Sequence, residues 1–331
     1  PAVYNADVHS FLARYLLWMR DCQKPNGQYP NIAPVGGGFG GIEWESAGII
    51  VTHVLFRHFN DLPLVQENYP AMKRYIEYLV SCGEPGKLTD IGPLGDWLAS
   101  DMSTDSPLLW NALYAHDAEV MSEMASAIGK TEDAKYFKEL YETVKRSWND
   151  TFVDPDTGKT RRMNGEINDT QCSYALPLAY GLFDNMAQAH EHLRRRTEEE
   201  GYTVTTGFIG TAQLNLALSA GGNTETAYRL LRQTKYPSWL YPVTKGATTI
   251  WEHWNSYTVE NGFGGNNAMN SFNHYSLGAV GEWIYKCVLG ISLDEKVNAF
   301  KHFIYRPLIG DLEYAEGYHD SVYGRIESGW E

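Results

Sequence analysis

Residues 107–150 read PLLWNALYAHDAEVMSEMASAIGKTEDAKYFKELYETVKRSWND, and the spacing of their apolar side chains decides the fold class. Apolar residues recur there every three or four positions, which is typical of a helix with one buried face. This period predicts helices over 107–128 and 133–148, and Thr131 and Asp133 at the break are residue types that begin helices. The stretch is therefore expected to form a helical hairpin.

The same period recurs along most of the chain and predicts a mainly helical protein. Nine further helices are expected, over residues 8–19, 47–59, 69–79, 171–182, 185–198, 209–219, 224–234, 247–256 and 271–289. Short and long loops alternate between these eleven helices. Because an (α/α)6 toroid needs six hairpins, we expect an all-α toroid that is clipped by one helix at its N-terminal end. An α-solenoid or a bundle is the alternative, although no solenoid repeat period is visible.

The character of the sequence changes after Gly290, where short strands replace helices. Strands are predicted over 302–307 and 321–327, with turn residues between them. Two or three strands cannot bury a sheet face by themselves. We therefore expect a catalytic barrel over 1–292 and the start of a small C-terminal β-sandwich over 293–331, with further domains of the same polypeptide at both ends.

Composition excludes several classes of function. The chain has 331 residues, with 27 Lys and Arg against 41 Asp and Glu, and a net charge of −14. This balance argues against nucleic acid and anionic membrane surfaces, which bind clustered basic residues. No apolar run approaches the ~20 residues of a membrane-spanning helix. The histidines and cysteines form no metal motif, and the glycines of 36–41 match a dinucleotide fingerprint without the strand it requires, so we expect no metal and no cofactor.

Long loops are expected to carry the function, because loops of this length in a compact domain are usually functional. They cover 24–44, 83–105, 154–170, 199–208, 236–250 and 257–270, and they are rich in Trp, Gly, Asn and acidic residues. Loops of a toroid gather at one end of the ring, and aromatic faces with nearby carboxylates suit a carbohydrate. The residues expected at this mouth are Trp44, Glu45, Asp96, Trp97, Trp239, Trp251, Glu252 and Trp254.

Three segments combine unusual residues, namely 206–211, 236–254 and 270–275. The second contains Trp251-Glu252-His253-Trp254, a carboxylate between two indoles. Burying a carboxylate among indoles costs free energy, so this arrangement indicates a functional role for Glu252.

Together with Tyr4-Asn5-x-Asp7, the helix entry at 44–47 and Gly95-Asp96-Trp97, these segments resemble the catalytic domain of glycoside hydrolase family 78, the inverting α-L-rhamnosidases. The resemblance runs from about residue 4 to residue 331 and implies an (α/α)6 barrel followed by a small β-sandwich. It implies removal of terminal α-L-rhamnose, and a bacterial cytoplasmic or periplasmic location is expected.

By analogy with that family, Glu252 would be the general base that activates water. The resemblance also implies that Trp44, Trp97 and His274 line the sugar pocket. We expect three further residues to contact substrate: Asp96, Trp251 and Trp254.

Two departures from the family pattern stand out. The family carries its general acid in a D-x-x-E segment, and this chain contains none, so the acid is expected upstream of residue 1. Ser46 stands where the family often has Asp, which would alter sugar preference. The alternatives are an acidless carbohydrate-binding pseudoenzyme and another α/α-toroid glycosidase or lyase. A lyase needs a cation beside its base, and this acidic chain offers little positive charge.

Overall fold

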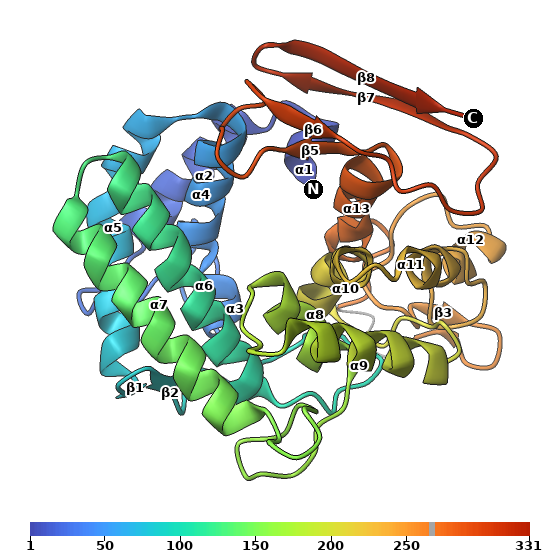
Figure 1. Ribbon diagram of the computed structural model, residues 1–331, viewed down its shortest axis with the longest axis horizontal. Coiled ribbons are helices and arrows are strands. Elements are labelled where there is room, and N and C mark those ends of the chain that lie inside the picture. The colour runs from blue at the N-terminus through green and yellow to red at the C-terminus, as the bar shows by residue number, and fades with distance from the viewer. Residues whose placement is uncertain (265–268) are drawn as a thin grey trace.

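The computed structural model describes residues 1–264 and 269–331, and its helices pack in a ring (Figure 1). Consecutive helices form antiparallel pairs, which confirms the toroid predicted from the sequence. The helices are α1 (Ala2–Asn5), α2 (His9–Asp21), α3 (Ile42–Glu45), α4 (Ala47–Phe59), α5 (Leu62–Ser81), α6 (Ser106–Ala127), α7 (Thr131–Phe152), α8 (Gln171–Ala179), α9 (Met186–Glu199), α10 (Phe208–Ala220), α11 (Thr224–Leu231), α12 (Leu240–Thr244) and α13 (Gly281–Trp283).

The hairpin of α6 and α7 forms where the 107–150 stretch predicted it. Large apolar side chains of both helices are fully buried, and the indole of Trp148 donates a hydrogen bond of 3.0 Å to the Leu108 carbonyl oxygen. Helix boundaries elsewhere follow local chemistry. Asn60 ends α4 in the left-handed conformation, and the Asp61 carboxylate accepts the Leu64 amide at 3.0 Å to begin α5.

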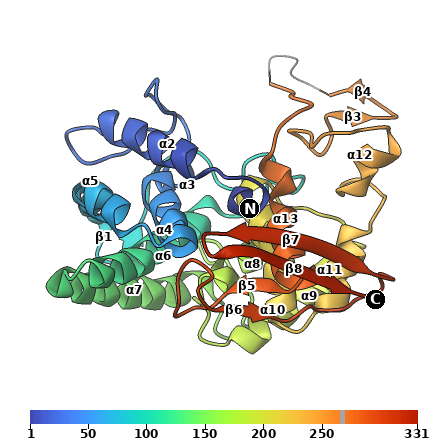
Figure 2. The same cartoon turned by 90° about the horizontal axis from the view of Figure 1, so that it is seen from above.

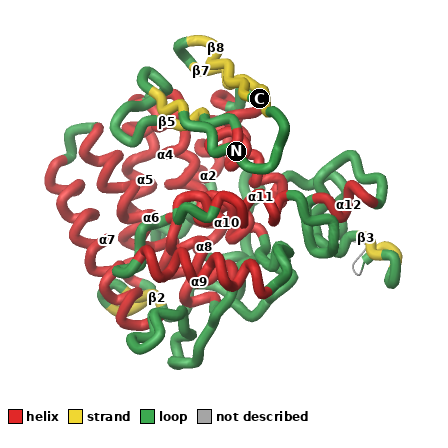
Figure 3. The backbone as a smooth tube through the Cα atoms, turned by 45° about the vertical axis from the view of Figure 1, so that its right-hand side comes forward, coloured by secondary structure: helices red, strands yellow, loops and turns green. Residues whose placement is uncertain are grey.

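Four antiparallel hairpins complete the described fold. They pair β1 (Gly83–Glu84) with β2 (Lys87–Leu88), β3 (Tyr257–Thr258) with β4 (Gly262–Phe263), β5 (Ile291–Leu293) with β6 (Phe303–Tyr305), and β7 (Ala315–Ser321) with β8 (Gly324–Trp330). The last two hairpins lie together at one edge of the ring, and α12 with β3 and β4 projects from it (Figures 1 and 3).

Three sequence predictions are wrong in detail. Residues 247–256, all of them described, form turns instead of a helix, because their backbone pairs with 271–274. The helix predicted over 271–289 begins at Ser276, where a 3-10 turn leads into α13 and a π-turn over 284–288. The strand predicted over 321–327 contains the turn between β7 and β8, which Gly324 permits at φ 121°.

An aromatic cluster joins the C-terminal hairpins to the ring. The ring of Tyr4 lies 5.0 Å from the rings of Tyr285 and His319 and 5.2 Å from that of His58. Phe300 completes the cluster, 4.5 Å from His319 and 5.6 Å from His58. Burial lowers the pKa of His58 to about 3 and also lowers the pKa of His319.

This cluster makes the fold less stable in mild acid. The unfolded chain binds a proton at His58 below about pH 6.5, whereas the folded chain does not until about pH 3, so stability is lost as pH falls through this window. Between pH 7 and pH 5, we expect the free energy of unfolding to fall by about 2 kcal/mol less in His58→Phe than in the wild type, as measured by urea unfolding. His302→Phe, at an exposed position, is the control. Equal losses in His58→Phe and the wild type would contradict this account.

Candidate functional site

The start of α10 is the centre of the candidate site. The Asp96 carboxylate accepts hydrogen bonds from the amides of Gly207 at 2.7 Å, Ile209 at 3.0 Å and Gly210 at 2.9 Å. The first amides of a helix lack partners within the helix, and a carboxylate satisfies them while complementing the helix dipole. These three hydrogen bonds favour the ionised form of Asp96 and lower its pKa. Burial has the larger effect, so the pKa of Asp96 is raised. Asp96 therefore fixes the 89–105 loop on α10.

The backbone of Trp97 closes on the same helix end. Its carbonyl oxygen accepts the Phe208 amide at 2.9 Å, and Leu98 follows in the left-handed conformation at φ 59°. A Cβ atom at Gly207 would lie 2.1 Å from that Trp97 oxygen. Only glycine permits this approach, so the loop and the helix require Gly207 at their junction.

Two more predicted residues reach this junction from other segments of the chain. The indole of Trp254 donates to the Thr206 carbonyl oxygen at 2.8 Å. The imidazole of His274 stacks on the Phe208 ring, with centroids 5.1 Å apart and planes at 25°. The structure thus brings Asp96, Trp97, Trp254 and His274 together around residues 206–208, although they come from three distant segments.

Glu252 is held by a pair of extended segments. Its amide donates to the Ser271 carbonyl oxygen at 2.9 Å, and the Ser271 amide returns a 2.7 Å bond to carboxylate oxygen Oε2. The His274 amide donates to the Ile250 carbonyl oxygen at 2.8 Å, which extends the pairing. The Glu252 side chain is 8% exposed, and its Oε1 atom forms no hydrogen bond within the described residues. One carboxylate oxygen is therefore fixed by the backbone of the 270–275 segment.

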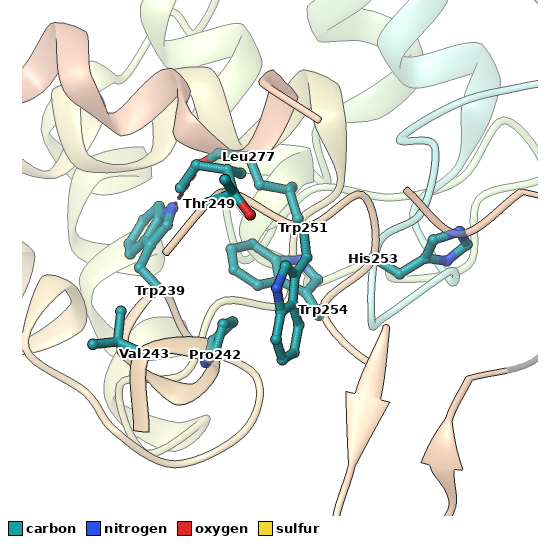
Figure 4. A pocket seen from close by; sticks show the side chains of 9 residues that line it. Trp239, Pro242, Val243, Thr249, Trp251, His253, Trp254 and Leu277 are labelled. Carbon is teal, nitrogen blue, oxygen red and sulfur yellow. Dashed lines mark hydrogen bonds between the residues drawn. The ribbon is translucent and has the colours of Figure 1, made fainter. Parts of the chain in front are cut away.

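Three tryptophans of the 236–254 segment line a pocket (Figure 4). Trp239, Trp251 and Trp254 line it, and all three side chains are buried. Trp239 and Trp254 pack edge to face at 5.9 Å, and the Trp239 indole donates to the Leu277 carbonyl oxygen at 2.7 Å. These indoles therefore frame the segment that carries Glu252.

Trp44 lies in α3, and Phe39, which the sequence analysis missed, packs between Trp44 and Trp97. The ring of Phe39 is 6.3 Å from that of Trp44 and 6.5 Å from that of Trp97. Phe39 is 54% exposed, so it lies at the rim of the site. The signal in the sequence was a single aromatic residue within the glycine-rich stretch 36–41.

Two buried acids flank Trp44. Glu45 accepts side-chain amide bonds from Gln28 at 2.7 Å and Asn31 at 3.2 Å. Glu43, which the sequence analysis also missed, buries both carboxylate oxygens without a hydrogen bond to any described residue. Burial raises the pKa of Glu43 well above its usual range and also raises the pKa of Glu45. No sequence pattern distinguishes Glu43 from Glu45.

The described residues offer no cluster of three or more His, Cys, Asp or Glu side chains that would hold a metal. None of the described helices is long and apolar enough to cross a membrane. The binding and catalytic roles assigned from the sequence stay predictions.

Comparison with known proteins gives the family. The family described as bacterial alpha-L-rhamnosidase 6 hairpin glycosidase domain matches residues 1–288, and the bacterial alpha-L-rhamnosidase C-terminal domain matches residues 290–331. An α-L-rhamnosidase of Streptomyces avermitilis is 32% identical over 100% of this chain and 31% of its own length. One from Formosa agariphila is 30% identical over 100% of this chain and 36% of its own length. The chain thus spans about a third of these relatives.

Solved structures agree with the fold. The crystal structure of the Streptomyces avermitilis α-L-rhamnosidase complexed with L-rhamnose superposes with a TM-score of 0.90, covering 98% of this chain and 31% of that one at 32% identity. The native α-L-rhamnosidase from Aspergillus terreus gives a TM-score of 0.88 at 27% identity, covering 98% of this chain and 38% of that one.

Asp96→Ala would leave three amides at the start of α10 without a partner in a buried place. We expect this substitution to lower the free energy of unfolding by about 2–4 kcal/mol, measured by urea unfolding with an unchanged slope. Asp90→Ala, at an exposed position of the same loop, is the control and should change stability by less than about 0.5 kcal/mol. Equal stability of the two variants would refute the anchoring role of Asp96.

Glu43→Gln tests the buried, unpartnered carboxyl. Because the pKa of Glu43 is raised on folding, the folded chain holds this proton more tightly, and stability is lost as pH rises above the unfolded value near 4.3. Glutamine does not titrate, so this loss is absent in Glu43→Gln. The melting temperature of the variant should exceed that of the wild type by about 2 °C at pH 8 and equal it near pH 4. Glu84→Gln, at an exposed site, should match the wild type at both pH values. A Glu43→Gln advantage that grows toward acid would contradict the assigned direction.

Proposed function

Since the chain belongs to the bacterial α-L-rhamnosidase six-hairpin glycosidase domain family, we propose that it forms the catalytic barrel of an inverting hydrolase that removes terminal α-L-rhamnose from glycans or glycosides. The observation that carries this proposal is the setting of Glu252. Its carboxylate is nearly buried, is fixed through Oε2 by the Ser271 amide, and accepts no hydrogen bond at Oε1 from the residues that the structure describes. A general base requires a fixed orientation together with an oxygen that is left for the water molecule.

Glu252 would act on a water molecule held at Oε1. As the water oxygen bonds to the anomeric carbon, Glu252 takes the water proton, while a general acid gives a proton to the departing glycosidic oxygen. The carbon–oxygen bond to the leaving group breaks on the opposite face, so the product has inverted configuration. Inverting enzymes keep the two carboxyl groups about 6.5–9.5 Å apart to leave room for that water. We propose that a segment upstream of residue 1 supplies the acid.

The residues around α10 would bind the sugar. Trp44 and Trp97 offer aromatic faces, which suit the methyl group that a deoxy sugar such as rhamnose carries. The His274 ring, stacked on Phe208, would present a nitrogen to a ring hydroxyl. Trp251 and Trp254 were also expected to touch substrate, and their burial favours a role in shaping the wall.

Asp96 differs from the other residues that were expected to contact substrate. We infer that it acts indirectly, because both of its oxygens already accept backbone amides. By holding the start of α10 against the 89–105 loop, it would position Trp97 beside the sugar.

For the domain organisation, we propose the barrel over 1–292 and the start of a C-terminal β-sandwich over 293–331. The two family matches meet between residues 288 and 290, which supports a boundary close to this point. Further domains of the same polypeptide at both ends are consistent with relatives about three times as long as this chain.

Glu252→Gln keeps the shape of the side chain and removes the base. We expect kcat on an aryl α-L-rhamnopyranoside to fall by about 10²–10⁴-fold in a polypeptide that includes the upstream segment. L-rhamnose binding, measured by calorimetry, should be largely kept. Glu260→Gln, at an exposed position of the same segment, is the control. Near-normal activity of Glu252→Gln would reject Glu252 as the base.

The position of the acid is tested by comparing this 331-residue chain with a polypeptide extended upstream. Activity only in the longer polypeptide is the expected result. If both are inactive and L-rhamnose still binds, the chain is a binding module rather than an enzyme.

A further inference from the structure

Two side chains connect the segment that carries Glu252 to the segment that returns beside it. The Nε2 atom of His253 lies 2.9 Å from the Met269 carbonyl oxygen. A carbonyl oxygen can only accept a hydrogen bond, so Nε2 carries the proton and donates. The Asn270 side-chain nitrogen donates to the Ser256 carbonyl oxygen at 3.2 Å. Both bonds run from a side chain to the backbone of the opposite segment, so each one cross-links the two segments.

The Asn270 side chain also joins the two ends of the β3–β4 hairpin, which lies on the outer part of a projection from the ring (Figure 2). Ser256 directly precedes β3, and Gly264 directly follows β4. The Asn270 side-chain nitrogen donates to the carbonyl oxygens of both, at 3.2 Å each. A Cβ atom at Gly264 would lie 2.5 Å from the Asn255 carbonyl oxygen, so the two ends approach closely. One side chain therefore holds both ends of the hairpin.

Ser256 continues these contacts into the backbone next to Glu252. Ser256 is buried, and its hydroxyl oxygen accepts the His253 amide at 3.1 Å. The Ser256 amide donates to the His253 carbonyl oxygen at 3.2 Å, which makes a tight turn directly after Glu252. Because the chain turns here, no backbone-to-backbone bond between described residues joins 253–256 to 269–270. Side chains therefore supply the connection on this side of Glu252.

The contact that these cross-links stabilise is the one between Ser271 and Glu252. Met269 and Asn270 directly precede Ser271, so fixing their positions fixes the direction in which the Ser271 amide points. That amide donates to Oε2 of Glu252 at 2.7 Å. Beyond Ser271 the two segments pair through their own backbone. The orientation of the Glu252 carboxylate thus depends on cross-links that do not involve Glu252 itself.

We propose that His253 and Asn270 are positioning residues that orient Glu252 by holding the Ser271 amide in place. The inference rests on the proposed function, in which Glu252 is the general base, and deepens it. Both side chains act through the backbone of 269–271, because their hydrogen bonds go to carbonyl oxygens and not to the Glu252 carboxylate. A misplacement of about 1 Å in a reacting group can lower a rate about 10²-fold.

A double-mutant cycle tests this account in a polypeptide that includes the upstream segment. We expect His253→Leu and Asn270→Ala each to lower kcat on an aryl α-L-rhamnopyranoside by about 10- to 100-fold. KM and inhibition by L-rhamnose should stay unchanged, because the loss falls on the transition state alone. In the Glu252→Gln background we expect neither substitution to lower kcat further, since a residue that only orients the base has no effect once the base is gone.

Two further variants separate the hydrogen bonds from general structural effects. His253→Gln keeps a side-chain N–H donor and should restore kcat to within about threefold of the wild type. Asn261→Ala is the matched control for Asn270→Ala, because it makes the same change at an exposed position in the turn between β3 and β4. It should leave kcat and KM unchanged.

Hydrogen exchange measures the contact without any reaction. Mass spectrometry of peptides that cover 269–275 should show exchange at least about tenfold faster in His253→Leu and Asn270→Ala than in the wild type. Exchange in Asn261→Ala should match the wild type. If Asn270→Ala does not fold, the comparison of His253→Leu with His253→Gln decides.

Three results would overturn the proposal. The first is an equal loss of kcat in the wild-type and Glu252→Gln backgrounds, which would assign the side chains to the fold in general. The second is a kcat of His253→Leu and Asn270→Ala within about twofold of the wild type. The third is unchanged exchange over 269–275. If the wild type hydrolyses no rhamnoside, the proposed function itself fails, and the exchange measurement alone decides whether the cross-links hold the Ser271 amide.

Discussion

Three backbone amides at the start of α10 need hydrogen-bond partners, and the buried Asp96 carboxylate accepts all of them. Its position brings the Trp97 carbonyl oxygen to the Phe208 amide. The same helix start supports the Trp254 indole and the His274 ring from other segments of the chain. Three loops from distant parts of the chain therefore meet because the amides at the start of α10 must be hydrogen-bonded.

The four carboxyl groups of the candidate site differ in their surroundings, and each therefore suits a different role. Asp96 is surrounded by amides and serves as an anchor, and Glu45 is held by the side-chain amides of Gln28 and Asn31. Glu43 has no hydrogen-bond partner among the described residues, which favours its neutral form. Glu252 lies between these cases, with one oxygen bonded and the other without a partner among the described residues. This intermediate setting is the one that supports the proposal of Glu252 as the base.

Local patterns predicted the ring but not the contacts that make the site. Apolar periodicity is a local property, so the α6–α7 hairpin was readable from residues 107–150. The pairing of Asp96 with Gly207 links positions 111 residues apart, and no periodicity encodes it. The helix predicted over 247–256 does not form for the same reason, because the backbone of this segment is hydrogen-bonded to residues 271–274. Phe39 was missed because a single aromatic residue among glycines has no period at all. Most candidate site residues were named from the long loops and from the carboxylate between two indoles, whereas the family resemblance added His274 and the roles, which remain predictions.

The aromatic cluster around Tyr4 has a consequence for synthesis. It joins residue 4 to Tyr285, Phe300 and His319, which are synthesised much later than residue 4. Ribosomes add about 5–20 residues per second, so these partners emerge roughly 15–60 s after Tyr4. During that interval Tyr4 has only His58 of its cluster as a partner, and the helices that have already formed make an open arc. The nascent chain therefore depends on residues 285–319 to close the ring, and until they emerge the open arc is exposed to proteases and aggregation.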